Sequence, residues 1–220
     1  LSTCSIWAQT NPYRFGSPHY WMAQGTLDIH AGKFDIAYEH LEKAQKGYRE
    51  LGDVGFQIQA TEAMGALKAG LGEWEKAKQH YQDALQIATE ANEDFAQSKV
   101  MVDLLALYRT VGDIIGYNQY LKALDSLYHV SNSAKLKTVY HLYWSNEYLA
   151  RKEFAMVETQ LLQCWDVMLD LPFSDREQVK LNYYSSMMNL KQQQRQYKDA
   201  IRAAKHYIEQ TKILNGRNSD

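Results

Sequence analysis

The chain has 220 residues, of which 23% are charged and 45% hydrophobic, and its formal net charge is −2 with a pI of about 6.4. This composition is typical of a folded globular chain and excludes a disordered or membrane-spanning one. Basic and acidic residues are mixed along the sequence, so we expect no concentrated basic surface and no direct nucleic-acid partner. No apolar run approaches the roughly 20 residues that span a bilayer, and no membrane insertion is expected.

Residues 1–17 are expected to form a leader ahead of the folded domain. Residues 1–9 resemble the end of a secretory signal that is cleaved after Ala8 or Gln9, and the segment up to Cys4 has a faint likeness to a lipoprotein box. An unstructured leader is the alternative. The expected localisation follows from this choice: periplasmic or exported with a signal remnant, and cytoplasmic without one.

A short motif first seen at residues 32–37 recurs four times along the chain. Its large apolar residue falls at Phe34, Trp74, Ile114, Phe154 and Tyr197. Three of these spacings are 40 residues and the last is 43. In the first three copies a glycine stands two positions before the apolar residue, and the fourth copy lacks it. A fixed period of this length indicates a stack of similar structural units.

Each copy of the motif lies between two helical patterns, which explains its residue types. The glycine ends the first helix, where a left-handed backbone is needed. The large residue then fills the corner, and a small residue three positions later allows the two helices to approach closely. The second helix continues with apolar residues at spacings of three and four, as in Ala37, Leu41, Ala44 and Tyr48. The motif therefore predicts helix hairpins.

Ten helices are expected, with short polar segments between the hairpins. They span residues 18–31, 34–50, 55–70, 74–91, 94–110, 114–130, 134–150, 154–170, 175–194 and 197–214. Residues 19–171 contain no proline, which favours a helical chain. Ser174 followed by Glu177 predicts a capping box at the start of the ninth helix.

The first hairpins carry the residues of a known family. In the first hairpin these are Trp21, Gly25, the corner at 32–34, Ala37, Leu41 and Ala44, and in the second Gly65, Gly72, Trp74, Ala77, Tyr81 and Ala84. They resemble the signature of the tetratricopeptide repeat. The resemblance implies an all-α, right-handed superhelical solenoid of about five antiparallel helix hairpins over residues 18–214, with a linker or tail at 215–220.

Two features depart from that family. Its ordinary repeat has about 34 residues, whereas the period here is 40, and the proline that usually closes the second helix is missing. We interpret the six additional residues as longer helices. HEAT-like repeats have a similar period and are the alternative, but they do not share the glycine-x-aromatic corner.

The resemblance implies that the first helix of each hairpin lines a concave, partner-binding face. The binding candidates carried over to this face are Glu62, Lys99, Arg109, Asn146, Asn182, Ser185, Asn189 and Gln192. The last four form an uncharged polar stripe, which is suited to an extended peptide because amides both donate and accept hydrogen bonds. Lys99 and Arg109 are suited to an acidic group. A dicarboxylate clamp of the chaperone-tail kind is disfavoured, because the first two hairpins lack the basic residues it needs.

No pattern in the sequence predicts catalysis. The seven histidines are scattered, Cys4 and Cys164 match no metal-ligand spacing, and no nucleophile elbow, phosphate loop or dinucleotide fingerprint is present. We expect no enzyme activity, no metal site and no cofactor. The expected partner is a protein or peptide.

The last helix has a second apolar stripe, which is broader than contact with one neighbour requires. The two stripes are Tyr197, Ile201, Ala204 and Ile208, and Ala200, Ala203, Tyr207 and Leu214. Since a helix that ends a repeat array should present a polar outer face, this pattern predicts that the array continues or that the last helix pairs in a homodimer.

Two function classes remain open, and both are protein-binding. Residues 121–127, 131–134 and 137–140 look like exported repeat regions that precede the output domain of bacterial signalling proteins, so an input or scaffold region of such a protein is the first hypothesis. A free-standing adaptor that organises a multiprotein complex is the alternative. A peptide-pheromone receptor of regulator type would require a deep closed groove.

Overall fold

The computed structural model describes residues 14–217, and every regular element within them is a helix. In chain order these are α2 (Pro18–His30), α3 (Phe34–Leu51), α4 (Val54–Gly70), α5 (Trp74–Glu90), α6 (Asp94–Val111), α7 (Ile114–Val130), α8 (Ala134–Ala150), α9 (Phe154–Met168), α10 (Phe173–Gln193) and α11 (Tyr197–Arg217). The expected all-α hairpin fold is confirmed, and each helix bound lies within three residues of the expected one. The leader and tail expected at 1–17 and 215–220 fall largely outside the described residues, although α11 continues to Arg217.

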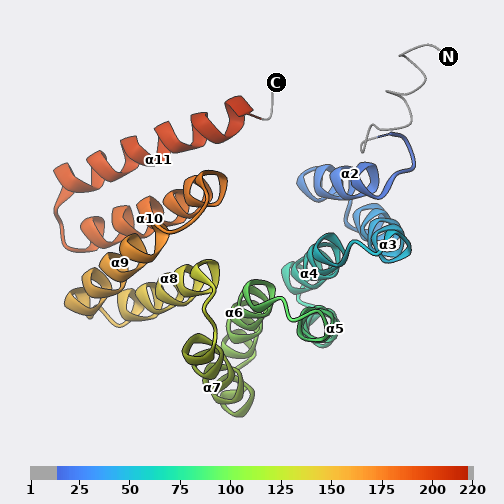
Figure 1. Ribbon diagram of the computed structural model, residues 1–220, viewed down its shortest axis with the longest axis horizontal. Coiled ribbons are helices and arrows are strands. Elements are labelled where there is room, and N and C mark those ends of the chain that lie inside the picture. Colours follow the sequence, from blue (N-terminus) through green and yellow to red (C-terminus); the bar gives the residue numbers. More distant parts are fainter. Residues whose placement is uncertain (1–13, 218–220) are drawn as a thin grey trace. The chain divides into compact units, whose positions relative to one another are not determined.

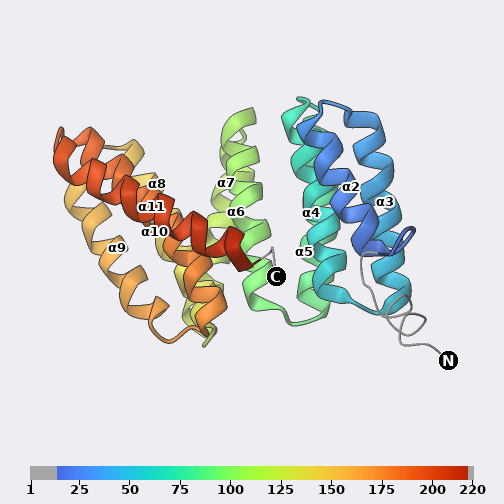
Figure 2. The same ribbon diagram turned by 90° about the horizontal axis from the view of Figure 1, so that it is seen from above.

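The chain divides into two compact units, Leu1–Ala123 and Leu124–Asp220. We call α2, α4, α6, α8 and α10 the A helices, and the helices that follow each of them the B helices. In the first unit α2 packs against α3, α3 against α4, α4 against α5 and α5 against α6 (Figures 1 and 2). In the second unit α8 packs against α9, α10 against both, and α11 against α10. Two pairs of A helices also contact each other: α4 with α6 in the first unit, and α8 with α10 in the second.

The hairpin corners are left-handed in all five copies of the motif. Gly32, Gly72 and Gly112 have φ of 72°, 75° and 76°, as their residue type predicts. Lys152 and Arg195 occupy the same position with φ of 60° and 58°. The corner geometry is thus kept in the two hairpins that have lost the glycine, at the cost of placing a side chain in a region that L-residues disfavour.

The expected capping box of the ninth helix is wrong. α10 begins at Phe173, and its N-cap is Pro172 (φ −53°), which makes no side-chain cap. Glu177 is buried instead, and its carboxylate accepts hydrogen bonds from Lys180 and from Gln210 of α11. Proline pre-sets the backbone for a helix start, so Ser174, two residues further on, lies inside the helix.

The apolar stripes of the B helices lie in the core, as the sequence predicts, together with buried A-helix residues such as Ile58, Leu104 and Leu190. The buried stripe residues are Ala37, Leu41, Ala44 and Tyr48 in α3, Ala77, Tyr81, Ala84 and Ala88 in α5, and Val157, Leu161, Cys164 and Met168 in α9. None of them is more than 5% exposed. Burying such side chains contributes about 25 cal/mol per Å² of apolar area, so this stripe is the main source of stability within each unit.

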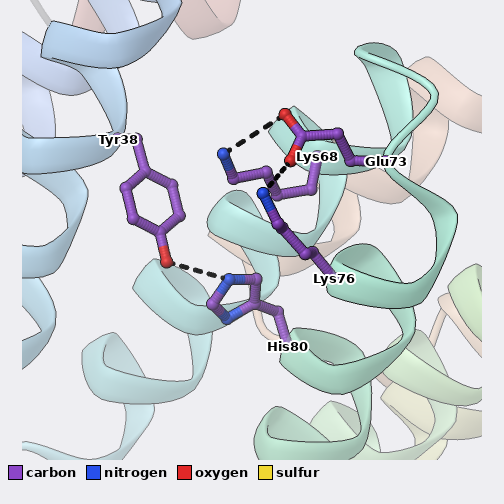
Figure 3. A network of polar contacts seen from close by, with 5 residues as sticks. All are labelled: Tyr38, Lys68, Glu73, Lys76 and His80. Carbon is purple, nitrogen blue, oxygen red and sulfur yellow. Dashed lines mark hydrogen bonds and ion pairs between the residues drawn. The ribbon is translucent and has the colours of Figure 1, made fainter.

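A polar network joins the first two B helices of the first unit (Figure 3). The Tyr38 hydroxyl of α3 is 3.1 Å from Nε2 of His80 in α5, and Nζ of Lys68 lies 4.3 Å from the centre of the Tyr38 ring. Glu73 accepts from both Lys68 and Lys76. Burial lowers the pKa of His80 and raises that of Tyr38, so both side chains are neutral at pH 7 and their contact is an ordinary hydrogen bond.

Candidate functional site on the A helices

Two A helices of the first unit are joined by an ion pair. Glu62 lies in the middle of α4 and Lys99 near the start of α6, and Nζ of Lys99 is 2.9 Å from Oε1 and 3.3 Å from Oε2 of Glu62. The Glu62 side chain is 18% exposed and the Lys99 side chain is 40% exposed. Both residues were expected on the binding face, and the structure brings them together. Because the lysine is already engaged, a partner meets this pair as one unit rather than as a free cation.

A second carboxylate lies beside that pair. Asp103 stands one helical turn after Lys99 on α6. Burial raises the pKa of Asp103 to about 7, and the negative charge of Glu62 acts in the same direction while Lys99 opposes it. Burial and the charge of Asp103 also raise the pKa of Tyr81 in α5. Glu62 and Asp103 therefore lie beside one lysine, and Tyr81 lies close to both carboxylates.

Arg109 is not part of this group. It lies ten residues after Lys99 on the same helix, about 15 Å along the axis at 1.5 Å per residue. It is exposed and lines a surface hollow at the corner between α6 and α7, with Tyr108, Gly112, Asp113, Ile114 and Tyr117. The structure thus places the two basic candidates of α6 at opposite ends of the helix, too far apart to hold one carboxylate.

The A helices of the second unit present the uncharged polar stripe. Asn182, Asn189 and Gln192 are exposed on α10, and Ser185 is half-buried between them. On the neighbouring helix α8, Asn146 is exposed, and its Oδ1 accepts a hydrogen bond of 3.4 Å from Ser186, the residue next to Ser185. Four of the candidates follow one side of α10 at helical spacing, and Asn146 of α8 is joined to α10 through Ser186. We call the five residues the amide face: Asn146, Asn182, Ser185, Asn189 and Gln192.

Asp103 and Tyr81 are the residues that the sequence analysis missed. The family resemblance implies Lys99 and Arg109 as the binding candidates of α6 and gives no role to Asp103. Lys99 and Asp103 are nevertheless four residues apart, the spacing at which oppositely charged side chains meet on a helix. That spacing was the available signal. The contribution of Tyr81 comes from another helix, and no local pattern shows it.

A buried histidine joins α8 to α9. His141 of α8 is 3% exposed, and its Nδ1 is 2.9 Å from Oε1 of Gln160 in α9. Burial lowers its pKa, so it is neutral at pH 7. Burial alone raises the pKa of the Cys164 thiol to about 12, which leaves it unreactive. Within the described part of the chain, no three His, Cys, Asp or Glu residues are grouped as a metal ion would need.

Comparison with known proteins agrees with this architecture. Residues 19–90, which form the first two hairpins, match the family model described as tetratricopeptide repeat. These two hairpins are similar to tetratricopeptide repeats. Beyond residue 90, the repeat assignment is supported by the common corner geometry and the buried stripe. Tetratricopeptide repeats are typically protein-interaction modules without catalytic activity.

A solved structure shows the same fold over most of the chain. BtubC (BKLC) from P. vanneervenii is 16% identical, with a TM-score of 0.53, and the alignment covers 96% of this chain and 87% of that one. At this identity the likeness concerns the fold alone. No curated protein sequence matches the chain significantly. Between residues 14 and 217, none of the helices has the length and apolar character of a membrane span.

Proposed function

We propose that this tetratricopeptide-repeat protein binds an extended segment of a partner protein on the amide face. The observation that carries the proposal is the contact between Ser186 and Asn146, which sets the side chains of α8 and α10 side by side. An extended backbone offers alternating N–H and C=O groups, and primary amides can donate to one and accept from the other. The face therefore favours main-chain recognition.

The absence of charge on these positions predicts the character of the interaction. Binding through neutral amides should depend weakly on ionic strength, because there is little Coulomb attraction for salt to screen. The charged group around Lys99 belongs to the other unit and is internally balanced by Glu62. Main-chain recognition on the amide face is consequently expected to tolerate many peptide sequences, with preferences set by the side chains of the peptide.

A selection from a random peptide library on the whole chain tests the proposal. We expect enriched peptides to lose roughly tenfold in affinity in the double variant Asn182→Ala/Asn189→Ala, the size expected for two lost hydrogen bonds. Gln163→Ala is the matched control, because Gln163 is an exposed amide on α9. Enriched peptides whose affinity is the same in both variants, or a selection that enriches none, would overturn the proposal.

The cellular setting has two candidates. The likeness of the region around residues 121–140 to exported repeat regions of bacterial signalling proteins favours an input or scaffold role next to an output domain. A free-standing adaptor is the alternative. The sequence of the complete gene product decides between them: a kinase or DNA-binding segment in the same polypeptide supports the first setting, and a polypeptide made of repeats alone supports the second.

A further inference from the structure

The outward face of α11 is apolar and uncovered. Tyr197, Ile201 and Ile208 are 61%, 58% and 53% exposed, and with the half-buried Ala204 they form one stripe along the helix. α11 packs on α10, and its buried residues Ala200, Ala203 and Gln210 lie about a third of a turn from this stripe at 100° per residue. Isolated exposed apolar residues are common, but a continuous stripe of them at helical spacing marks an interaction surface.

The equivalent positions of the other B helices show which neighbour α11 lacks. The buried apolar stripe of a B helix lies 3, 7, 10 and 14 residues after its corner residue. In α3, α5 and α9 all four of these residues are buried between the A helix before and the A helix after. In α11 these positions are Ala200, Ala204, Tyr207 and Thr211. Only Ala200 is buried, and the other three are half-buried. Among residues 14–217, no helix takes the place of the following A helix over α11.

Other residues of the B helices show how the following A helix is normally bound. In α3, Gln45 donates to Thr61 of the following A helix at 3.1 Å, and in α9, Glu158 accepts from Lys191 of the following A helix at 3.0 Å. The equivalent positions of α11 are Ile208 and Ile201. Polar contacts are thus replaced by isoleucines, so an occupant of this place must present apolar side chains.

A row of lysines runs beside the apolar stripe. Lys198, Lys205 and Lys212 are exposed and seven residues apart, which places them on one side of the stripe at 100° per residue. Of the side chains described on α11, the exposed Arg202 pairs with Asp199, and Nδ1 of His206 lies 3.5 Å from Oε2 of Glu209. Among the described side chains, none forms an ion pair with the three lysines. The row is therefore available to carboxylates of an occupant.

The same row argues against a second copy of α11 as the occupant. In an antiparallel pair related by a two-fold axis, the equivalent flanks of the two helices face each other. Each lysine row would then oppose its own copy, and like charges in contact are unfavourable. A helix with acidic flanks carries the opposite charge, so in the same geometry its carboxylates face the lysine row and are attracted to it.

We infer that the outward face of α11 is a docking site for an acidic amphipathic helix of a partner protein. The apolar side of that helix covers Tyr197, Ile201 and Ile208, and its carboxylates lie along the lysine row. This site differs from the amide face in both chemistry and position, since one binds a helix through apolar contact and charge and the other an extended chain through neutral hydrogen bonds.

Two synthetic peptides of about 20 residues, long enough to form a helix when bound, serve as the probe. Both carry the same leucine stripe, flanked by glutamates in one and by lysines in the other. Fluorescence anisotropy with the whole chain should show the glutamate peptide binding roughly tenfold or more tightly, the size expected for three exposed ion pairs. This preference should shrink as salt is raised.

Charge reversal provides the decisive variant. Lys205→Glu/Lys212→Glu should shift the preference towards the lysine peptide, a result that loss of structure cannot produce. Ile201→Glu/Ile208→Glu should abolish binding of both peptides. The matched controls are Lys46→Glu on α3 and Ile115→Glu on α7, which are exposed and lie on other helices. Far-UV circular dichroism confirms that each variant is folded.

Three results would overturn the inference. The first is equal affinity for the two peptides, and the second is no binding of either. The third is a dimer in light scattering that Ile201→Glu/Ile208→Glu converts to a monomer, because the occupant is then a second copy. Asn182→Ala/Asn189→Ala should leave binding of the glutamate peptide unchanged, so failure of this site and failure of the amide face are distinguishable.

Discussion

A Cβ atom added to Gly65 of α4 would lie 2.8 Å from Cδ1 and Cε1 of the Tyr81 ring in α5. Tyr81 is buried and belongs to the apolar stripe of α5. The close approach of α4 and α5 therefore depends on the missing side chain. Gly25 has the same role in the first hairpin, where an added Cβ would lie 3.0 Å from Leu41.

Gly65→Ala should lower the free energy of unfolding by about 1–3 kcal/mol, because the tyrosine ring must shift in a filled core. Gly70→Ala is the matched control on the same helix, since an added Cβ meets no atom within 4 Å there. It should raise stability by up to about 1 kcal/mol through helix propensity. Urea unfolding of the two variants measures both effects, and shifts in the same direction would contradict the packing argument.

Lys152→Gly should stabilise the protein by about 1 kcal/mol. Lys152 has φ of 60°, and its N–H and that of Glu153 bond to Leu149 and Tyr148 in the same pattern as Gly32 and Lys33 at the first corner. Glycine removes the steric cost of the left-handed backbone without changing these bonds. Thermal and urea unfolding provide the measurement.

Lys46→Gly is the control for that substitution, because Lys46 is exposed in the interior of α3. Here glycine should destabilise by about 1 kcal/mol. If both glycine substitutions destabilise the protein, the left-handed corner at Lys152 is not strained.

The corners also show how far the sequence determines the fold. The 40-residue period and the corner residues predict every helix, because the residues that end one helix and begin the next are local signals. The expectation that the large corner residue fills the turn is wrong: Phe34, Trp74, Ile114 and Tyr197 are 40%, 39%, 72% and 61% exposed. The same reasoning fails at Ser174 and Glu177. A serine and a glutamate three residues apart predict a capping box, but Pro172 starts the helix earlier, and the carboxylate binds Gln210, 33 residues away.

The family resemblance assigns Glu62, Lys99 and the residues of the amide face to a binding surface, and that assignment stays a prediction. It does not show that Lys99 is already bound by Glu62, nor that Asp103 joins them. Those facts depend on how deeply neighbouring helices pack, which no single helix encodes.

Asp103 should make the protein less stable as the pH rises. Its pKa is raised to about 7 in the folded chain, from a model-peptide value near 3.9 in the unfolded one. Between these values the folded state binds more protons, so the free energy of unfolding falls with increasing pH. The contribution of Asp103 is close to zero below pH 4 and is fully unfavourable above pH 7.

Asp103→Asn removes this dependence while keeping the size of the side chain. Compared with the parent chain, it should be more stable at pH 8, by an amount on the order of 1–2 kcal/mol as for other buried polar groups. The two chains should converge towards pH 4. Urea unfolding at a series of pH values measures the difference, which also cancels the titration of all other groups. Parallel pH profiles would show that Asp103 is ionised without penalty in the folded state.

Glu177→Ala should loosen α11 before it affects the other helices. The Glu177 side chain is buried, and Oε2 accepts a hydrogen bond of 2.8 Å from Nε2 of Gln210, which is itself 5% exposed. Removing the carboxylate leaves the amide of Gln210 and the ammonium of Lys180 without this acceptor, a loss of about 2–3 kcal/mol. Because the contact joins α10 to α11, amide hydrogen exchange should accelerate first in residues 197–217. Glu209→Ala, at an exposed position of α11, should leave exchange unchanged, and equal acceleration in both variants would mean that Glu177 does not hold α11 in place.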